Sequence, residues 1–419
     1  MNGSDVAVIG GGAIGVCCAL ELARAGASVT LLEVGDEVGA GCSAGSAGLI
    51  CPSHAAPLAT RTGLLLGLRS SLSRDGPFAL QLRPSLLPWI ARFAAACTPA
   101  RERHATAVLR SLSLASLALH EQLGAELGTG VRRLGTFNVY ETEHGFDVGR
   151  REAAEHADAG LRPQVLSGRE AAELEPALLG PVAGAVYYAD ELSGDPLEFV
   201  RVVGDAARYA GADVRTRTEV RALRSRGSRV ALETADGPLT AGAVVLAAGA
   251  WSPRLASNLR LALPVQGGKG YHVEYEPSDQ DPRVPIFLQE ARVIATPLAR
   301  SLRLAGTLEL TGLDLSINER RIDAIERAGM RRVRALAGRP RLRVWRGLRP
   351  VSPDGLPIVG RPSAYENLVL ATGHAALGFT LAPLTGRLVA QVIANEPTDH
   401  DLGPLHPDRF SRARASRRA

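Results

Sequence analysis

The chain has 419 residues, of which 46% are hydrophobic and 22% are charged, as in an ordinary globular protein with an extensive core. This composition excludes a disordered chain, and no run of about 18 uncharged apolar residues is present, so we expect no membrane span. The net charge of +5 comes from the last eleven residues, which hold five arginines and no acid. Without them the chain is balanced, so nucleic-acid binding is not expected. The five are Arg409, Arg412, Arg414, Arg417 and Arg418, and they predict a solvated, disordered end.

The cysteines and the N-terminus point to a reducing compartment. Cys17, Cys18, Cys42, Cys51 and Cys97 form no Cys-x-x-Cys pair and no Cys/His spacing typical of a metal site. We therefore expect reduced thiols and no metal. Because no basic segment precedes the first apolar run, we expect no secretory signal and a cytoplasmic location. Peripheral association with the inner face of the membrane and the oligomeric state stay open.

The first 33 residues carry a nucleotide-binding pattern. The run Asp5–Ile9 predicts a buried strand, an Ala/Leu-rich segment ending at Gly26 predicts a helix, and Ser28–Leu32 predicts a second strand that ends in Glu33. Between the first strand and the helix the chain reads Gly-x-Gly-x-x-Gly, the dinucleotide-binding fingerprint. A glycine-rich loop without a ligand is the alternative.

Each residue of this fingerprint has a mechanical role. Gly10 makes the tight turn out of the strand, and Gly12 lets the backbone approach a pyrophosphate at the positive end of the helix. Gly15 allows helix and strand to pack closely, and Glu33 can accept hydrogen bonds from a ribose diol.

The rest of the chain alternates helices and strands. Val34–Ile50 is rich in Gly, Ala and Ser, which suggests backbone passing close to a flat ligand, and residues 51–83 are irregular. The apolar segments Leu64–Leu68 and Leu86–Phe93 either belong to the core or touch a membrane surface. The predicted helices are Ser85–Ala96, Arg101–Leu127, one from Ser167, Asp195–Ala210, Arg320–Leu336 and one ending at Ala394. The predicted strands are Arg133–Tyr140, Ala183–Ala189, Asp213–Arg217, Arg229–Glu233, Ala243–Ala247, Gly270–Tyr275, Val293–Thr296, Arg303–Leu310 and Leu368–Ala371.

These features resemble the D-amino-acid oxidase superfamily of flavoproteins over residues 4–396. The likeness is greatest to bacterial D-amino-acid dehydrogenases, including the D-hydroxyproline type, with glycine and sarcosine oxidases as cousins. Beside the N-terminal fingerprint, the motifs that carry it are Cys42–Gly48, Asp190-Glu191, Asp195-Pro196, Ala247–Trp251, Gly347–Pro350, Asp354-Gly355 with Pro357, and Gly373–Thr380.

The resemblance implies an α/β fold with two domains. A Rossmann-type FAD-binding domain would be assembled from residues 1–83, 185–265 and 345–396. An α+β substrate domain with a large mixed or antiparallel sheet would comprise residues 84–184 and 266–344. Residues 397–419 would form an Arg-rich C-terminal extension.

The resemblance also implies noncovalent FAD, because no cysteine occupies the C-terminal flavin turn. The residues that it assigns to FAD are Gly10, Gly12, Ala13, Ile14, Gly15, Glu33, Val34, Cys42, Ser43, Ala47, Gly48, Val220, Ala248, Gly249, Trp251, Gly347, Gly373, His374, Leu377, Gly378, Phe379 and Thr380. His374 either donates a hydrogen bond at the pyrimidine edge of the flavin or only packs.

Two positions depart from the family pattern. Ser46 stands where the flavin loop usually has Asn, which affects the tuning of the flavin. Ala376 stands where glycine oxidases have a second carboxylate-binding arginine, which counts against a glycine oxidase and leaves Arg349 alone for the acid group.

Several side chains are candidates for the substrate pocket. Arg349 matches the arginine that binds the substrate carboxylate, a task that suits a planar guanidinium; alternatively it pairs with Asp354. Tyr271 and His272 either line the pocket or are ordinary alternating strand residues, and His54 is a further candidate. The remaining alternative concerns Lys269, which either places positive charge near the flavin or is an exposed strand residue.

The resemblance therefore implies FAD-dependent oxidative deamination of D-amino acids. Hydride would pass from the α-carbon to flavin N5, and the imino acid would hydrolyse to a 2-oxo acid and ammonia. D-Proline or a hydroxyproline would give a cyclic imine, and the acceptor would be a quinone or a carrier protein. The alternatives are a glycine/sarcosine-type oxidase that uses oxygen, a non-catalytic FAD-binding subunit of a complex, and an NAD-dependent dehydrogenase.

Overall fold

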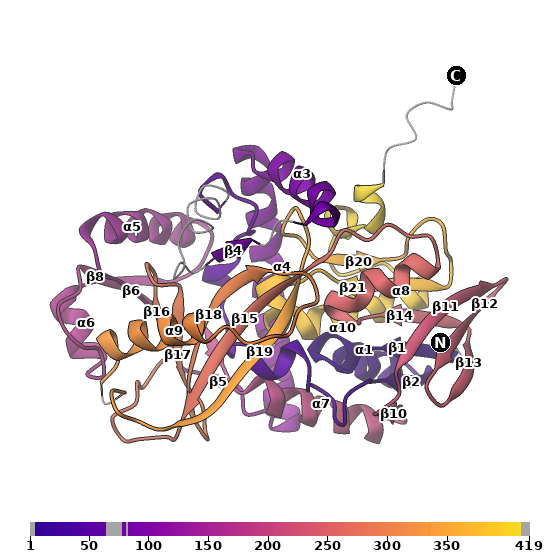
Figure 1. Ribbon diagram of the computed structural model, residues 1–419, viewed down its shortest axis with the longest axis horizontal. Coiled ribbons are helices and arrows are strands. Elements are labelled where there is room, and N and C mark those ends of the chain that lie inside the picture. Colours follow the sequence, from indigo (N-terminus) through magenta and orange to yellow (C-terminus); the bar gives the residue numbers. More distant parts are fainter. Residues whose placement is uncertain (1–4, 64–77, 81–82, 335, 412–419) are drawn as a thin grey trace.

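The computed structural model describes residues 5–63, 78–80, 83–334 and 336–411. In these residues the N-terminal and C-terminal segments, indigo and yellow in Figure 1, lie together on one side of the molecule. The strands of a larger sheet, mostly magenta and orange, extend to the other side.

The N-terminal strand is near the centre of a sheet that has six strands in the described chain. In spatial order these are β10 (Asp213–Arg215), β2 (Ser28–Leu32), β1 (Asp5–Ile9), β14 (Ala243–Leu246), β21 (Leu368–Thr372) and β20 (Ile358–Gly360). Neighbours pair in parallel except β20, which runs antiparallel to β21. The predicted βαβ unit is thus present, and segments from the beginning, middle and end of the chain complete its sheet.

Alternate residues of β1 face two different cores. Val6 and Val8 pack with a layer of helices: α1 (Ala13–Arg24), α4 (Pro99–Leu127), α7 (Pro196–Tyr209) and α10 (Gly378–Ala394). Ala7 and Ile9 pack with α8 (Ser252–Asn258) and a small antiparallel sheet, β11 (Val220–Arg226), β12 (Arg229–Thr234) and β13 (Gly237–Ala241). Both faces of the strand are therefore buried, as is usual for a parallel sheet.

Residues 229–233 form the expected strand, β12, which pairs with β11 and β13 in the small sheet that packs beside the nucleotide sheet. Two predicted elements differ from the observed ones. The predicted strand 133–140 is divided into β5 (Arg132–Arg133) and β6 (Thr136–Tyr140) at Gly135, whose φ of 78° interrupts an extended chain. The helix α9 (Glu319–Arg332) ends four residues before the expected Leu336.

The larger sheet has nine strands in the described residues and is mostly antiparallel. Its order is β19 (Arg341–Val351), β15 (Gln266–Tyr275), β18 (Leu302–Leu310), β17 (Val293–Pro297), β16 (Ile286–Leu288), β6, β8 (Gly184–Tyr188) and β7 (Pro163–Ser167), with β4 (Phe78–Leu80) beside β18. The two sheets give the α/β architecture that the sequence predicts. Expected domain boundaries at residues 185 and 345 fall inside β8 and β19, so both strands belong wholly to the larger sheet.

Strand β15 separates the hydrophobic core of this sheet from its other face. Tyr271, Val273 and Tyr275 pack with the apolar side of α9. Because side chains alternate along a strand, Gly268, Gly270 and His272 belong to the opposite face. Two helices, α5 (Glu143–Asp158) and α6 (Gly168–Leu174), cover the far end of the sheet (Figure 1).

The C-terminal extension is not solvated at its beginning. Arg409, in the short helix η7 (Pro407–Phe410), forms an ion pair with Asp354 at 2.8 Å and donates to the carbonyl of Leu356. The described residues 397–411 thus continue the fold, whereas residues 412–419, for which we expected disorder, lie outside the described chain.

One segment has the length and apolar composition of a membrane span, Ala375–Ala394, but Arg387 interrupts it and it is mostly buried. It consists of η5 (Ala375–Leu377) and α10, and it packs against α1 and α4 as a core helix.

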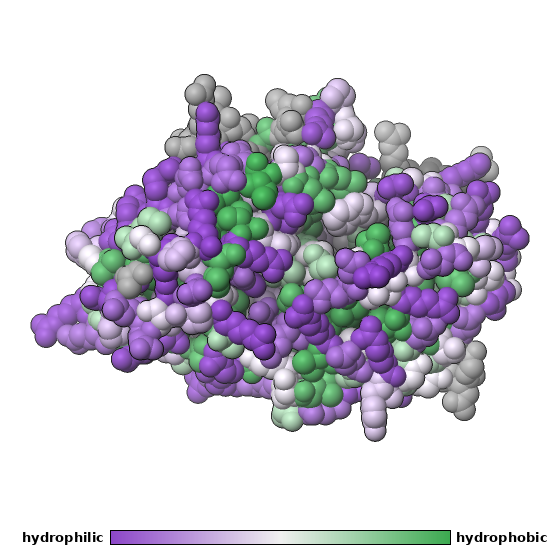
Figure 2. All heavy atoms as spheres, turned by 60° about the horizontal axis from the view of Figure 1, so that its bottom comes forward, coloured by the Kyte–Doolittle hydropathy of each residue, from purple (hydrophilic) through white to green (hydrophobic). Residues whose placement is uncertain are grey.

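Of the two apolar segments singled out above, 64–68 lies outside the described residues. In the other, Trp89 and Phe93 of α3 (Leu87–Ala96) are buried. Figure 2 shows a mainly hydrophilic face on which hydrophobic residues form separate small groups.

A buried histidine joins the two long helices of the nucleotide part. His120 of α4 has no exposed surface, and its Nε2 donates to the carbonyl of Phe379 at 3.0 Å. Its ring contacts Phe199 and Phe379. Burial lowers the pKa of His120 to about 4, so the ring is neutral at pH 7.

We predict that His120→Gln makes stability less dependent on pH. Between the unfolded pKa of about 6.5 and the folded value, only the unfolded state binds this proton, so stability present above pH 6.5 is lost as the pH falls. The substitution should reduce the drop in unfolding free energy between pH 7 and pH 5 by about 2 kcal/mol. Urea denaturation at both values measures it, with His104→Gln at an exposed site of α4 as control. An unchanged drop would contradict the prediction.

Candidate active site

A large cavity lies where the two sheets meet. Its volume is about 620 Å³, and its walls include Ile9, Leu32 and Ala247, at or just beyond the ends of β1, β2 and β14. The carboxyl ends of parallel strands are the usual ligand site in such sheets. Side chains from β16, β17 and β19, together with the backbone of Gly270 in β15, close the opposite wall.

At one end of the cavity, the turn after β1 lies close to the end of β14. Gly10 has φ of 105°, and a Cβ there would lie 2.6 Å from the carbonyl oxygen of Ala247, so only glycine fits. At Gly12 a Cβ would meet only the hydroxyl of Ser43 and would otherwise point into free space. The N-terminus of α1 begins here, with the Ala13 N–H bonded to that hydroxyl at 2.9 Å. This end is therefore shaped to receive an anionic group at a helix N-terminus.

Glu33 is fixed at the same end by backbone donors. Its carboxylate accepts hydrogen bonds from the N–H groups of Gly11 at 2.5 Å and Gly35 at 2.7 Å. Val34 and Val220 line the cavity beside it. The carboxylate thus ties two turns together at the place where a ribose is expected.

The segment after β2 is held by side chains of the larger sheet. The carbonyls of residues 45–47 each accept one hydrogen bond from a buried side chain. The donors, in order, are Nδ1 of His272 at 3.3 Å, Nη1 of Arg303 at 2.6 Å and Oγ1 of Thr296 at 2.8 Å. Because donors from three strands hold the loop, its position depends on the larger sheet.

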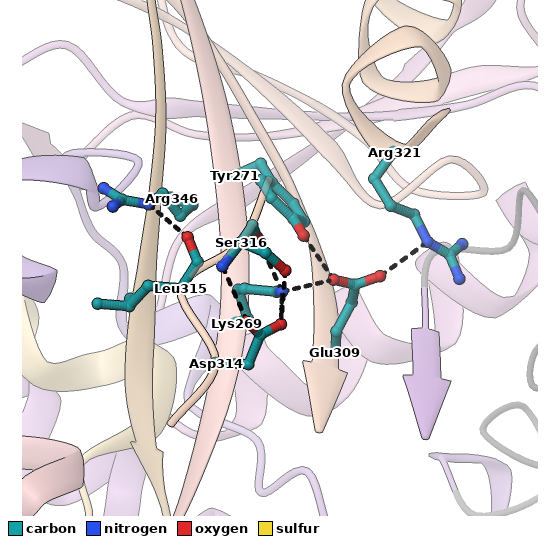
Figure 3. A network of polar contacts seen from close by, with 8 residues as sticks. All are labelled: Lys269, Tyr271, Glu309, Asp314, Leu315, Ser316, Arg321 and Arg346. Carbon is teal, nitrogen blue, oxygen red and sulfur yellow. Dashed lines mark hydrogen bonds and ion pairs between the residues drawn. The ribbon is translucent and has the colours of Figure 1, made fainter. Parts of the chain in front are cut away.

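Two of the expected pocket residues do not reach the cavity. Tyr271 is on the α9 face of β15, and its hydroxyl donates to Glu309 at 2.6 Å (Figure 3). His272 is on the cavity face but has no exposed surface, because the indole of Trp345 stacks on it at 5.1 Å between ring centres. The expectation that these two side chains line the pocket is therefore wrong.

Lys269 also lies outside the cavity lining, and it is not exposed. Its ammonium group is buried and donates to Asp314 at 2.7 Å and to the carbonyl of Ser316 at 2.9 Å (Figure 3). Glu309, at 3.6 Å, also pairs with it and with Arg321. This network anchors the loop after β18, so the alternative of an exposed strand residue is wrong, and the charge of Lys269 is paired outside the cavity lining.

Arg349 lines the cavity without an ionic partner. Its Nη1 donates to the carbonyl of Thr307 at 2.9 Å, and no carboxylate in the described part of the chain pairs with it. Asp354, the alternative partner, is bonded to Arg409 instead. Burial lowers the pKa of the Arg349 guanidinium from its usual range, which is typical of a desolvated cation. An arginine nonetheless stays charged at neutral pH.

His54 lines the cavity from the short helix η2 (Pro52–His54). Its Nε2 is 2.9 Å from Oδ1 of Asn138, and its ring meets Phe287 edge-on at 4.9 Å. Burial lowers the pKa of His54 to about 4, so the ring is neutral at pH 7.

The turn before α10 forms the remaining wall. His374 lines the cavity; its Nε2 lies 3.1 Å from the hydroxyl of Thr385, and its buried Nδ1 has no partner among the described residues. Burial lowers the pKa of His374 to about 3. The free Nδ1 leaves both alternatives for His374 open, a contact to a ligand and packing alone.

Most of the expected cofactor residues border the cavity. Those on its walls are Gly10, Gly12, Ala13, Ile14, Glu33, Val34, Cys42, Ser43, Ala47, Val220, Ala248, Gly249, Trp251, Gly347, His374, Leu377, Gly378, Phe379 and Thr380. Gly15, Gly48 and Gly373 are not on them. Gly15 instead packs α1 against the turn, because a Cβ there would overlap the carbonyl of Gly10.

Several cavity residues escaped the sequence reasoning. Phe287, Ile294 and Trp345 supply apolar walls, and Gly270 supplies a bare stretch of strand. A glycine inside a predicted strand often marks a close approach, so Gly270 could have been found. The three apolar residues look like any core residues in sequence. Within the described ranges no group of three His, Cys, Asp or Glu residues could hold a metal.

Comparison with known proteins agrees with this geometry. A family model described as FAD dependent oxidoreductase matches residues 5–392. The D-amino acid dehydrogenase of Paramagnetospirillum magneticum is 34% identical, covering 97% of this chain and 99% of that protein. The D-amino-acid oxidase of Bradyrhizobium diazoefficiens is 31% identical, covering 98% and 99%. The structure of glycine oxidase from Geobacillus kaustophilus superposes with a TM-score of 0.80 at 27% identity, covering 98% and 99%.

We predict that Thr296→Val destabilises the loop that Thr296 holds. The substitution removes the donor to the Ala47 carbonyl and leaves a buried acceptor unpaired, so the unfolding free energy should fall by about 1–3 kcal/mol. Urea denaturation followed by circular dichroism measures it. Thr240→Val, on the exposed side of β13, is the matched control and should be nearly neutral. Equal effects of the two substitutions would contradict the role of the hydrogen bond.

Proposed function

Because the chain belongs to the family of FAD dependent oxidoreductases, as its motifs predicted, we propose that it is a D-amino-acid dehydrogenase. It is a flavoprotein that oxidises amino acids at a CH–NH group. The proposal of a D-amino-acid dehydrogenase rests on Arg349. This arginine is half-buried in the cavity and has no ionic partner among the described residues. The chain around it is similar to a D-amino acid dehydrogenase over 97% of its length. The NAD-dependent alternative is inconsistent with this family.

The residues of the cavity suit FAD. The free space at Gly12, the N-terminus of α1 and the carboxylate of Glu33 are arranged for a diphosphate and a ribose. The turn of residues 374–380 and the loop of residues 42–47 would border the ring. No cysteine lies in that turn, so we propose noncovalent binding. When bound, the flavin supplies the two-electron acceptor of the reaction.

The substrate end of the cavity suits a neutral amino acid. Among the described residues, Arg349 is the cation at this end with donors left for a carboxylate, and a guanidinium can bind both oxygens. His54 is neutral, and Phe287 and Ile294 are apolar, so the side chain of the substrate would meet an apolar wall. The carboxylates in the cavity lining of the described chain are Glu33 and Glu219, at the nucleotide end.

For the electron acceptor we propose a quinone or a carrier protein. One support is the His-x-x-Leu-Gly-Phe-Thr sequence of residues 374–380, which resembles the dehydrogenase branch of the family. The other is the likeness to proteins named as dehydrogenases. A likeness to a D-amino-acid oxidase keeps oxygen as the second candidate. A cytoplasmic location stays a prediction from the sequence, and peripheral association with the membrane stays open.

We predict that D-amino acids with apolar side chains bleach the flavin under anaerobic conditions, whereas L-amino acids do not. The measurement is flavin absorbance on mixing with matched D- and L-amino acids, glycine, sarcosine and both prolines. Aerobic turnover should yield little peroxide and require an added acceptor. Bleaching by glycine or sarcosine with stoichiometric peroxide would favour the oxidase. No bleaching by any compound would favour a non-catalytic subunit.

We predict that Arg349→Ala raises KM and lowers kcat/KM by roughly 30- to 1000-fold, which corresponds to about 2–4 kcal/mol for a buried charge pair. Steady-state kinetics with the best D-amino acid measures it. Arg346→Ala is the matched control, because Arg346 is on the same strand but donates to the carbonyl of Leu315, away from the cavity. An unchanged KM in Arg349→Ala would remove the carboxylate role.

A further inference from the structure

A β-bulge lies directly beside Arg349. In the pairing of β15 with β18, Lys269 faces Glu309 but Tyr271 faces Gly306, so Gly270 alone stands opposite two residues, Thr307 and Leu308. Thr307 has φ of 67°, the left-handed region, and no other non-glycine residue within a described strand has a positive φ. A β-branched residue is strained there, and such strain often accompanies a functional site.

Within the described chain, the acceptor that holds the guanidinium belongs to the bulge. The carbonyl of Thr307 accepts from Nη1 of Arg349 at 2.9 Å. Bulges commonly redirect a group that a regular ladder would use for strand pairing. The acceptor is a neutral carbonyl, so it orients the guanidinium without neutralising its charge. A carboxylate in the same place would compete with an anionic substrate.

Glycines form the surface on which the guanidinium rests. Gly270 and Gly347 face each other across β15 and β19. A Cβ at Gly270 would overlap the guanidinium, with Cζ at 2.6 Å and Nη2 at 2.7 Å. A Cβ at Gly347 would overlap the indole of Trp345 in the same way. Each side chain therefore lies directly against the backbone of a glycine, and the two glycines are paired neighbours on adjacent strands.

We propose that Gly270 and the bulge at Thr307 are positioning elements for Arg349. They fix the position and orientation of the Arg349 guanidinium, which has no ionic partner among the described residues. Its remaining N–H donors are left for the substrate carboxylate. The inference rests on the proposed carboxylate role of Arg349. It adds two residues that act through Arg349 and touch no reacting atom.

The test is a double-mutant cycle on the FAD-loaded full chain with Gly270→Ala, Arg349→Ala and the double variant. Gly270→Ala should raise KM and lower kcat/KM by roughly 100-fold, since a shift of about 1 Å in an orienting group has that effect. It should weaken competitive inhibition by propanoate, which has a carboxylate and no amine, to the same degree. In the Arg349→Ala background the same substitution should change kcat/KM by less than about twofold, because the group it displaces is absent.

A matched glycine is available for comparison. At Gly124 of α4 an added Cβ would make only an ordinary contact, 3.6 Å from the Thr129 hydroxyl, so Gly124→Ala should keep the wild-type KM. If Gly270→Ala loses FAD, removal of the overlapping guanidinium in the double variant should restore it.

Several results would overturn the proposal. In the first, Gly270→Ala keeps the wild-type KM while Arg349→Ala has a raised KM. This result would contradict the positioning role of Gly270 and leave the proposed function intact. In the second, Gly270→Ala lowers kcat/KM, or FAD binding, by the same factor whether residue 349 is arginine or alanine. Gly270 would then act independently of Arg349. A wild-type KM in Arg349→Ala itself would overturn both this inference and the carboxylate role.

Discussion

A short stretch of backbone, residues 45–49, links the two sheets of this protein, and all five of its carbonyls are bonded by distant partners. The first three are held by side chains of the larger sheet, and the last two by the N–H of Gly194 and the hydroxyl of Thr380. The segment lies between the nucleotide part, the larger sheet and the turn before α10. The cavity therefore has a defined shape only after both sheets have formed and met.

Buried charged residues of the scaffold have ionic partners, whereas the arginine of the candidate active site has none in the described chain. Lys269 is matched by Asp314 and Glu309, and Arg303 by Glu274 at 2.6 Å. Unpaired buried charge is costly, so these pairs are what a stable interior requires. Arg349 lacks such a match among the described residues and is held by a carbonyl instead. A site for an anion gains from this arrangement, because the charge is already desolvated and oriented before the substrate arrives.

The sequence predicted correctly those features that depend on residues close together in the chain. The βαβ unit could be read because apolar runs, glycines and Glu33 follow one another over 33 residues, and each role depends on near neighbours. Sequence reasoning failed for Tyr271 and His272 as pocket residues. Both sit in a strand that was correctly predicted, but one points to α9 and the other is covered by Trp345.

By itself the sequence determined the family, the flavin and the existence of an arginine suited to a carboxylate, because motif order and residue chemistry persist without coordinates. Only the tertiary structure decided which charged groups are paired. Asp354 is five residues after Arg349 in sequence yet bonds to Arg409, and the group that holds Arg349 is the carbonyl of Thr307 on another strand. The physical reason is that burial and hydrogen bonding depend on contacts between distant segments. A backbone carbonyl, moreover, leaves no trace in the amino-acid sequence.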